Sequence, residues 1–202
     1  MNDKTVVHVV DDDAAMRDSM AFLLDVNGFE PRVYDSAAAL LAESPIDALS
    51  CVVSDIRMPG MNGIELVREL KSKGSACPVI LVTGHGDVAL AVEAMKAGAA
   101  DFIEKPFDDA VLLGAIRSAL DARPAFQGDS SAKTEAEARL AELSPRERDV
   151  LRGLVAGKIN KVIAHDLSIS PRTVEVYRAN LMAKTGARSM SELMRIALAA
   201  GL

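Results

Sequence analysis

Three consecutive carboxylates end the first apolar run of the chain. The run Val6–Val10 is followed directly by Asp11, Asp12 and Asp13. Two carboxylates about 4 Å apart repel by roughly 4 kcal/mol at an effective dielectric constant near 20. A cation, a helix N-terminus or protonation could offset that repulsion. Because a helical pattern follows Asp13, we expect Asp13 to cap a helix and the other two carboxylates to face a cation.

Other polar residues end later apolar runs. Asp55 follows the third run, Thr83 ends the fourth and Lys105 follows the fifth. Carboxylates form a hard oxygen site suited to Mg²⁺, which binds through one or two carboxylates plus a phosphate. A lysine and a hydroxyl beside that site suit phosphoryl transfer, because its transition state spreads negative charge over three equatorial oxygens. No phosphate-binding loop with Gly-Lys-Ser/Thr occurs, so no nucleotide site is predicted.

The elements that must position these residues read as an α/β fold. Five apolar runs alternate with helical patterns, which predicts βαβ units and a parallel sheet covered on both sides. Ligands of such sheets bind outside the carboxyl ends of the strands. The expected strands are Val6–Val10, Arg32–Tyr34, Cys51–Ser54, Val79–Thr83 and Phe102–Glu104, and the expected helices are Ala14–Asn27, Ala37–Glu43, Ile64–Ser72, Val88–Ala97 and Asp109–Asp121.

Charge divides the 202 residues into two parts. Residues 1–122 hold 20 acidic and 10 basic side chains, for −10, whereas residues 123–202 hold 9 and 13, for +4. This division suggests that the acidic part binds cations and that the basic part binds an anionic partner. We expect one domain at 1–122 and another at 140–202. Residues 123–139, with Pro, Gly and Ser, read as a linker that could continue as a helix from Thr134.

Some classes of protein are not expected. The start of the chain lacks a signal-peptide pattern and no apolar stretch reaches about 18 residues, so we expect a cytoplasmic protein without a membrane partner. Cys51 and Cys77 lack metal-ligand spacing and read as buried, reduced thiols. His8 lies mid-strand and is predicted to be a packed core residue, whereas His85 lies in a loop near the expected site.

The basic part shows helix signals only. We expect four helices at about 145–156, 159–166, 171–185 and 189–200. The tight turn LSIS at 167–170 separates a short helix from a longer one, which is the helix-turn-helix plan with its second helix in the major groove of DNA. The pattern alone leaves open a helical packing or dimerisation domain with an ordinary charged surface.

Four motifs of the first part resemble the receiver domain of two-component response regulators. They are DDD at 11–13, SDIRMPGMNG at 54–63, VTGHGD at 82–87 and DFIEKPF at 101–107, and the resemblance covers residues 5–121. It implies a doubly wound, five-stranded sheet of flavodoxin-like order. It also implies that Asp55 accepts a phosphoryl group from a sensor histidine kinase.

The same resemblance implies roles for other residues. Asp12, Asp55 and the backbone carbonyl of Arg57 would hold Mg²⁺, with Asp11 acting through water. Thr83 and Lys105 would bind phosphoryl oxygens, and the Lys105–Pro106 bond would be cis. Phe102 would be the switch aromatic, and a dimer face would include Val92 and Lys96.

The second part resembles the LuxR-type DNA-binding domain. The residues that carry the resemblance are LSPRERDVL at 143–151, GKINKVIAHDLSIS at 157–170 and TVEVYRANLMAKTGARS at 173–189. It implies a four-helix domain with Pro171–Lys184 as recognition helix and the last helix used for dimerisation. The implied phosphate contacts are Lys161, Arg172, Thr173, Arg178 and Lys184, and the implied groove-facing residues are Glu175, Val176 and Ala179. Ala179 departs from relatives that carry Lys there.

The two parts together resemble the NarL/FixJ class of transcription regulators, and residues 84–107 are most similar to its nitrogen-fixation members. This predicts a regulator, not an enzyme, that dimerises when phosphorylated, binds double-stranded promoter DNA, works with RNA polymerase and activates nitrogen-fixation or low-oxygen genes.

Two alternatives belong to other classes. A haloacid-dehalogenase-type, Mg²⁺-dependent phosphatase would use Asp11 as nucleophile and Asp13 as acid/base, but Ala15 stands where Thr or Val is expected and no cap domain is seen. A small-molecule-sensing LuxR-type regulator would need an aromatic-rich pocket, and the chain has no Trp.

Overall fold

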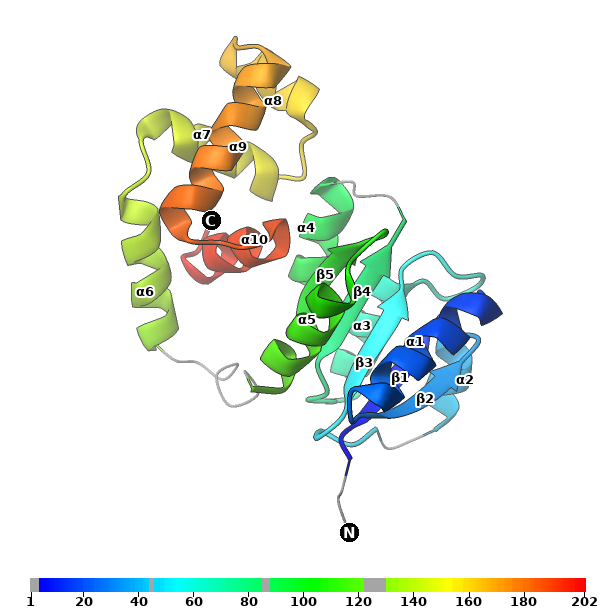
Figure 1. Cartoon of the computed structure of the whole chain (residues 1–202). Helices are drawn as coiled ribbons and strands as arrows, with labels where there is room; N and C mark the ends of the chain where they lie inside the picture. Colours follow the sequence, from blue (N-terminus) through cyan, green and yellow to red (C-terminus); the bar gives the residue numbers. More distant parts are fainter. Residues whose placement is uncertain (1–3, 44–45, 85–87, 122–129) are drawn as a thin grey trace. The chain divides into compact units, whose positions relative to one another are not determined.

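The computed structural model describes residues 4–43, 46–84, 88–121 and 130–202. It contains two compact units, and each is described by itself. The first holds the β-sheet and the second is helical (Figure 1). His85 and the segment 122–129 lie outside the described residues.

All five strands of the sheet are parallel. They are β1 (Val6–Val10), β2 (Glu30–Tyr34), β3 (Cys51–Asp55), β4 (Val79–Thr83) and β5 (Asp101–Glu104), in the order β2-β1-β3-β4-β5. The predicted flavodoxin-like order is confirmed. β2 lies on one side of β1 and β3 lies on the other, so the strand order reverses at this point. In such sheets the crevice for a ligand lies there, at the carboxyl ends of β1 and β3.

Helices of the first unit cover both faces of the sheet. They are α1 (Ala14–Val26), α2 (Ala37–Ala42), α3 (Gly63–Ser72) and α5 (Asp109–Asp121), whereas α4 (Val88–Ala97), except for its last residue, belongs to the second unit. α1 and α5 lie on the near face in Figure 1 and α3 lies behind the sheet. Since side chains alternate along a strand, one face of the sheet packs on α1 and α5 through residues that include Val9, Val53, Val82, Leu24 and Ile116.

A buried polar chain crosses the first unit at β1 and β2. His8 is 4% exposed, which confirms the prediction of a core residue. The Tyr34 hydroxyl donates to Glu43 Oε2 at 2.6 Å and lies 3.0 Å from His8 Nδ1. Because the hydroxyl gives its proton to the carboxylate, Nδ1 of the ring is the donor toward Tyr34. Burial lowers the pKa of His8, aided by the nearby charge of Arg32, so the ring stays neutral at pH 7.

The helical unit contains α6 (Ser130–Ala141), α7 (Pro145–Val155), α8 (Asn160–Leu167), α9 (Pro171–Thr185) and α10 (Met190–Ala199). The last four match the predicted helices closely. α6 begins earlier than the expected continuation at Thr134 and packs on α10 and α9 through the buried Ala136 and Leu140. Half of the segment that reads as a linker is therefore a packed helix.

Local capping explains where the second helix of the helix-turn-helix begins. Ser170 Oγ accepts from the backbone N–H of Thr173, and Pro171 occupies the first helical position, where its missing N–H costs nothing. Ser168 ends α8 in the left-handed conformation with φ 55°. This left-handed residue turns the chain so tightly that only three residues separate α8 from α9.

One further expectation is met by the two cysteines. Cys51 and Cys77 are buried free thiols, as predicted. Among the described residues, no helix is both long enough and apolar enough to cross a membrane.

Gly63 lets α3 begin directly against the end of β3. A Cβ atom at Gly63 would lie 2.4 Å from the carbonyl oxygen of Asp55. We expect Gly63→Ala to destabilise the first unit by about 1 to 3 kcal/mol, because the end of β3 must move. The control is Gly114→Ala on α5, where nothing lies within 4 Å; alanine there should stabilise by about 0.5 to 1 kcal/mol. Scanning calorimetry of both variants checks this, and equal unfolding temperatures would contradict it.

Candidate functional site

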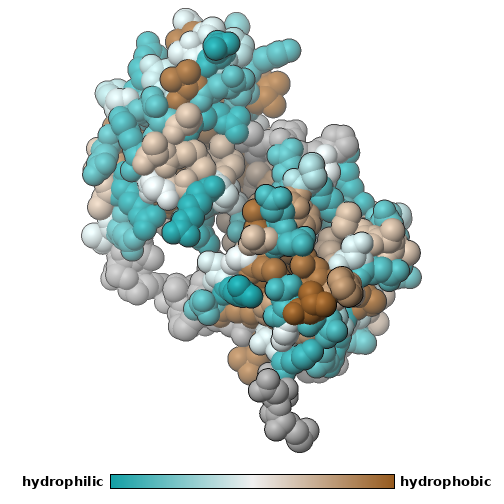
Figure 2. All heavy atoms as spheres, viewed as in Figure 1, coloured by the Kyte–Doolittle hydropathy of each residue, from teal (hydrophilic) through white to brown (hydrophobic). Residues whose placement is uncertain are grey.

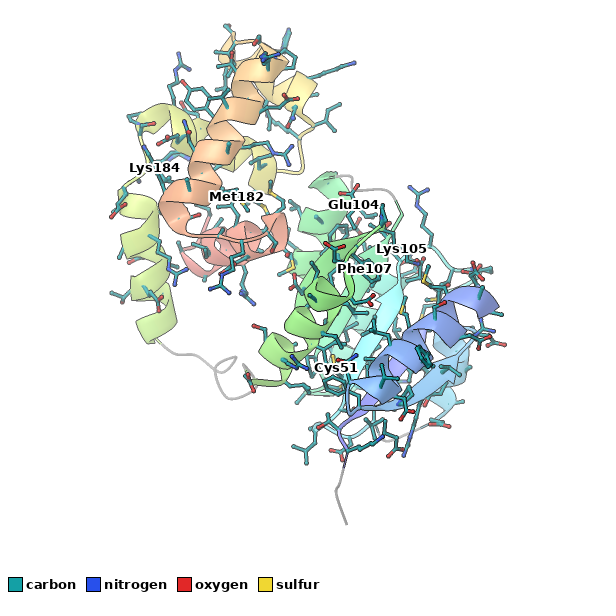
Figure 3. The ribbon with its side chains drawn as sticks, in the orientation of Figure 1. Cys51, Glu104, Lys105, Phe107, Met182 and Lys184 are labelled. Atoms are coloured by element: carbon teal, nitrogen blue, oxygen red, sulfur yellow. The ribbon has the colours of Figure 1, made fainter. Side chains whose placement is uncertain are left out.

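Lys105, directly after β5, lies between Asp11, directly after β1, and Asp55, the last residue of β3. Lys105 Nζ donates to Asp55 Oδ1 at 2.8 Å and to Asp11 Oδ2 at 2.9 Å. The side chains of Asp11 and Asp55 are 3% and 11% exposed, and that of Lys105, labelled in Figure 3, is 19% exposed. Within this structure the cation that offsets the carboxylate repulsion is therefore an ammonium group.

The surroundings keep Lys105 charged. Burial acts to lower the pKa of its ammonium, but the hydrogen bonds to Asp55 and Asp11 outweigh burial, and the pKa is raised. A raised pKa means that the pairing stabilises the fold at all pH values below the usual lysine range and is lost only as the pH rises above it. The ion pairs are thus present throughout the physiological range.

Backbone groups fix the remaining carboxylate oxygens. The N–H of Arg57 donates to Asp55 Oδ2 at 2.6 Å, and the N–H of Asp13 donates to Asp11 Oδ1 at 2.9 Å. Asp13 in turn accepts from the N–H of Ala15, which confirms its predicted role as the cap of α1. Asp12, the next residue after Asp11, is exposed. The site therefore offers two oriented carboxylates and one exposed carboxylate.

Arg17 joins the site although the motifs did not single it out. Its Nη1 donates to the backbone carbonyl of Asp11 at 2.7 Å. The bond ties the first turn of α1 back to the end of β1. The signal in the sequence was a basic residue one helical turn after the N-cap Asp13, where a side chain can reach back to the preceding strand.

Thr83 and Phe102 occupy neighbouring strands beside the carboxylates. Thr83 ends β4 and is fully buried, and its backbone carbonyl accepts from the N–H of Lys105 at 2.7 Å. Phe102 pairs in register with Leu81 on β4 and is half-buried. Their roles as phosphoryl ligand and switch aromatic stay predictions.

Two further expectations come from the resemblance to receiver domains. The Lys105–Pro106 peptide bond is cis, as the resemblance implied. Val92 and Lys96 lie four residues apart on α4, so they share one side of the helix. Their role in dimerisation stays a prediction.

The donor set at the carboxyl ends of β1 and β3 fits Mg²⁺. Among the residues that the structure describes, no three His, Cys, Asp or Glu side chains form a ready metal cluster. The predicted set needs only Asp12, Asp55 and the Arg57 carbonyl as direct ligands, because Mg²⁺ keeps several waters. Each carboxylate oxygen of Asp55 accepts one hydrogen bond and keeps a second lone pair, so a cation can still be coordinated.

In the second unit, α9 has the two-sided character of a recognition helix. Val174, Leu181 and Thr185 are buried against the unit. Arg172, Glu175 and Ala179 are exposed, and Val176 is 55% exposed. At about 100° per residue these four form one stripe opposite the buried residues. The visible surface of this unit is mainly hydrophilic with scattered hydrophobic residues (Figure 2).

The predicted phosphate contacts divide into two groups. Lys161 and Arg172 are exposed. The others have partners within the unit: Arg178 Nη1 donates to Asn160 Oδ1 at 3.1 Å, Thr173 Oγ1 lies 2.8 Å from Ser170 Oγ, and Lys184 Nζ donates to Glu147 Oε2 at 2.8 Å. A partner within the unit holds these side chains in place.

Comparisons with known proteins match both units. Residues 7–117 match the response regulator receiver domain, and residues 141–197 match the bacterial regulatory proteins of the luxR family. The transcriptional regulatory protein FixJ of Bradyrhizobium diazoefficiens is 54% identical over 100% of this chain and 98% of its own length. FixJ of Rhizobium meliloti is 52% identical over the same shares.

More distant relatives and solved structures agree. The C4-dicarboxylate transport regulator DctR of Rhodobacter capsulatus is 43% identical over 94% of this chain and 98% of its own. The crystal structure of full-length FixJ from B. japonicum is 52% identical, covers 98% of both chains and has a TM-score of 0.56. These matches exclude both alternatives, the haloacid-dehalogenase-type phosphatase and the small-molecule-sensing regulator.

Removing the shared ammonium should make the stability of the first unit depend on pH. In Lys105→Met, two buried carboxylates face each other without their cation, so we expect a loss of roughly 2 to 4 kcal/mol at pH 8. The loss should shrink toward pH 5, because one carboxylate can then take up a proton in the folded state. Thermal unfolding at both pH values measures this.

The matched control is Lys73→Met. Lys73 pairs with Glu69 on the surface of α3, with both side chains well exposed, so it should change stability by less than about 1 kcal/mol. A pH-independent loss in Lys105→Met would contradict the role given to the ammonium.

Proposed function

Because this chain belongs to the NarL/FixJ family of response regulators, we propose that Asp55 is the residue at which it accepts its phosphoryl group. The chain is a phosphorylation-dependent transcription regulator with a receiver and a LuxR-type DNA-binding domain. These domains imply a sensor kinase and DNA as partners. The observation that supports Asp55 is the Lys105 ammonium 2.8 Å from its Oδ1.

The proposed transfer uses groups that are already in place. The phosphorus–nitrogen bond of the kinase phosphohistidine breaks, and a phosphorus–oxygen bond to Asp55 forms. Lys105 then exchanges a carboxylate oxygen for a phosphoryl oxygen, with little movement of its side chain. Thr83, buried at the end of the neighbouring strand β4, binds another phosphoryl oxygen.

Mg²⁺ is the proposed cofactor. Asp12, Asp55 and the Arg57 carbonyl would hold it, with Asp11 acting through water. When bound it neutralises charge on the transferring phosphoryl group. The residues of the chain supply the orientation: the Arg57 N–H fixes the Asp55 carboxylate, and Arg17 fixes the β1–α1 turn that presents Asp12.

The output proceeds through a change in population. Phosphorylation pulls Thr83 toward the new group, Phe102 turns inward, and the face that contains Val92 and Lys96 favours a homodimer. The dimer presents two α9 helices to half-sites about one helical turn apart. The proposed DNA contacts are Lys161, Arg172, Thr173, Glu175, Val176, Arg178 and Ala179; Lys184 is treated below.

Its cellular setting follows from the resemblance. We place the regulator in the cytoplasm, where it meets promoter DNA and RNA polymerase, and assign it nitrogen-fixation or low-oxygen genes. The proposed domain bounds are residues 1–122 for the receiver and 140–202 for the DNA-binding domain, with 123–139 between them. α6 is the part of that segment that packs on the helical unit.

The first test is phosphorylation by acetyl phosphate with Mg²⁺. The native chain should gain one phosphoryl group by intact mass and elute as a dimer in size-exclusion chromatography, whereas Asp55→Asn should do neither. Asp18→Asn, an exposed carboxylate on α1, is the control and should behave as the native chain. Modification of Asp55→Asn would contradict the assignment, and a mass gain without a dimer would retain Asp55 but remove dimerisation as the output.

A second test addresses the cation. Chelation with EDTA should abolish phosphorylation by acetyl phosphate. Asp12→Asn should lower its rate at least about tenfold at limiting Mg²⁺, because a ligand is lost. The fold should be unaffected, since Asp12 is exposed. The rate is followed by intact mass against Mg²⁺ concentration, and a rate that does not depend on Mg²⁺ would refute the cofactor.

A further inference from the structure

One carboxylate of the helical unit is buried and has no part in the function described so far. Glu147 lies in the first turn of α7 and is 3% exposed. Its Oε2 accepts from the backbone N–H of Ser144 at 2.7 Å, while Ser144 Oγ accepts from the N–H of Glu147 at 3.3 Å. This reciprocal pair is a capping box, which satisfies two backbone donors at the start of the helix.

The same carboxylate oxygen also binds the recognition helix. Lys184 Nζ donates to Glu147 Oε2 at 2.8 Å, across 37 residues of sequence (Figure 3). The Lys184 side chain is 40% exposed and that of Glu147 is 4% exposed. Among the described residues, Lys184 is the one cation that pairs with this carboxylate, and a buried carboxylate that loses such a partner carries an uncompensated charge. Withdrawal of Lys184 toward a DNA phosphate would therefore leave an unfavourable charge behind.

The direction of Lys184 on the helix also separates it from the groove-facing stripe. At about 100° per residue, Lys184 lies about 130° around the axis from the mean direction of Arg172, Glu175, Val176 and Ala179. It comes one residue before the helix ends at Thr185, at the end far from Arg172. Lys184 is thus on a flank of α9 that faces α7.

We propose that Lys184 is a positioning residue and not a DNA contact. Together with Glu147 and Ser144, it fixes the C-terminal end of α9 against the N-terminus of α7. This link sets the angle at which α9 enters the groove. The inference rests on the proposed role of α9 as the recognition helix. Ser144 makes the link rigid, because the capping box holds the carboxylate in one place.

The ionisation of Glu147 supports this arrangement. The hydrogen bond from Lys184 is the largest cause that lowers the pKa of the carboxyl group, followed by the bond from the Ser144 backbone, against the opposing effect of burial. A lowered pKa keeps the carboxylate charged, and the link intact, at neutral pH.

The test separates contact from positioning by the salt dependence of DNA binding. The full chain, phosphorylated with acetyl phosphate, is titrated against a duplex of about 30 base pairs that the native chain selects from a random pool, long enough for two half-sites. Each lost phosphate contact lowers the slope of log K against log salt by roughly 0.9, whereas a change in geometry alone leaves that slope unchanged.

We expect Lys184→Gln and Glu147→Gln each to weaken binding by roughly 5- to 20-fold with the native salt slope. The double variant should be no weaker than either single variant, because both remove one link. Lys184→Arg should restore binding, since it restores the cation. Thermal unfolding of each variant verifies that the helical unit remains folded at the assay temperature.

Other results would overturn the proposal. A slope reduced by about one in Lys184→Gln, with native or tighter binding by Glu147→Gln, would make Lys184 a phosphate contact. Native affinity in both single variants would show that the link positions nothing. Arg172→Gln tests the premise separately: it should reduce the slope, and if it does not, the proposed docking of α9 fails whatever Lys184 does.

Discussion

The placement of one ammonium group between two carboxylates determines how the first unit is built. β1 and β3 are adjacent and parallel, with Val10 opposite Ser54. The residues that follow them, Asp11 and Asp55, are thus brought side by side by the backbone pairing itself. Their mutual repulsion must be offset by a group from a third element, and Lys105 provides it from the far end of the sheet. The strand pairing and the lysine together therefore build the site.

That constraint explains which parts of the structure could be predicted. Strand ends and caps are local: Asp13 caps α1 and Ser170 caps α9 because each side chain reaches a backbone N–H a few residues away. The meeting of Asp11 with Asp55 follows from strand order. The hydrophobic alternation gave the strands to within one or two residues, and β2 begins earlier only because Glu30 bonds back to Thr5.

What could not be predicted depends on partner choice between distant elements. Among the described side chains of α6, only Ala136 and Leu140, one turn apart, are buried. The exposed ion pair of Arg139 with Glu135 contributes little to stability. The helix becomes evident only when α10 is there to cover it. Likewise, a lysine on a basic helix reads as a phosphate contact until the buried carboxylate of Glu147 is found beside it. The net charge of a helix cannot distinguish a lysine that contacts DNA phosphate from one that pairs with a buried carboxylate.

Two lysine–carboxylate pairs of equal length, 2.8 Å, thus have opposite consequences in one chain. Lys105 faces carboxylates at the crevice of the sheet, where the exposed Asp12 marks an opening to solvent. Under the proposed phosphorylation of Asp55, the phosphoryl group would take over hydrogen bonds of Lys105 and would replace the carboxylate charge that it removes. Lys184 faces a carboxylate that is enclosed and already tied to a helix N-terminus, so no exchange is favourable there. The two ion pairs therefore differ in whether a replacement charge can reach the carboxylate: it can at Lys105–Asp55, and it cannot at Lys184–Glu147.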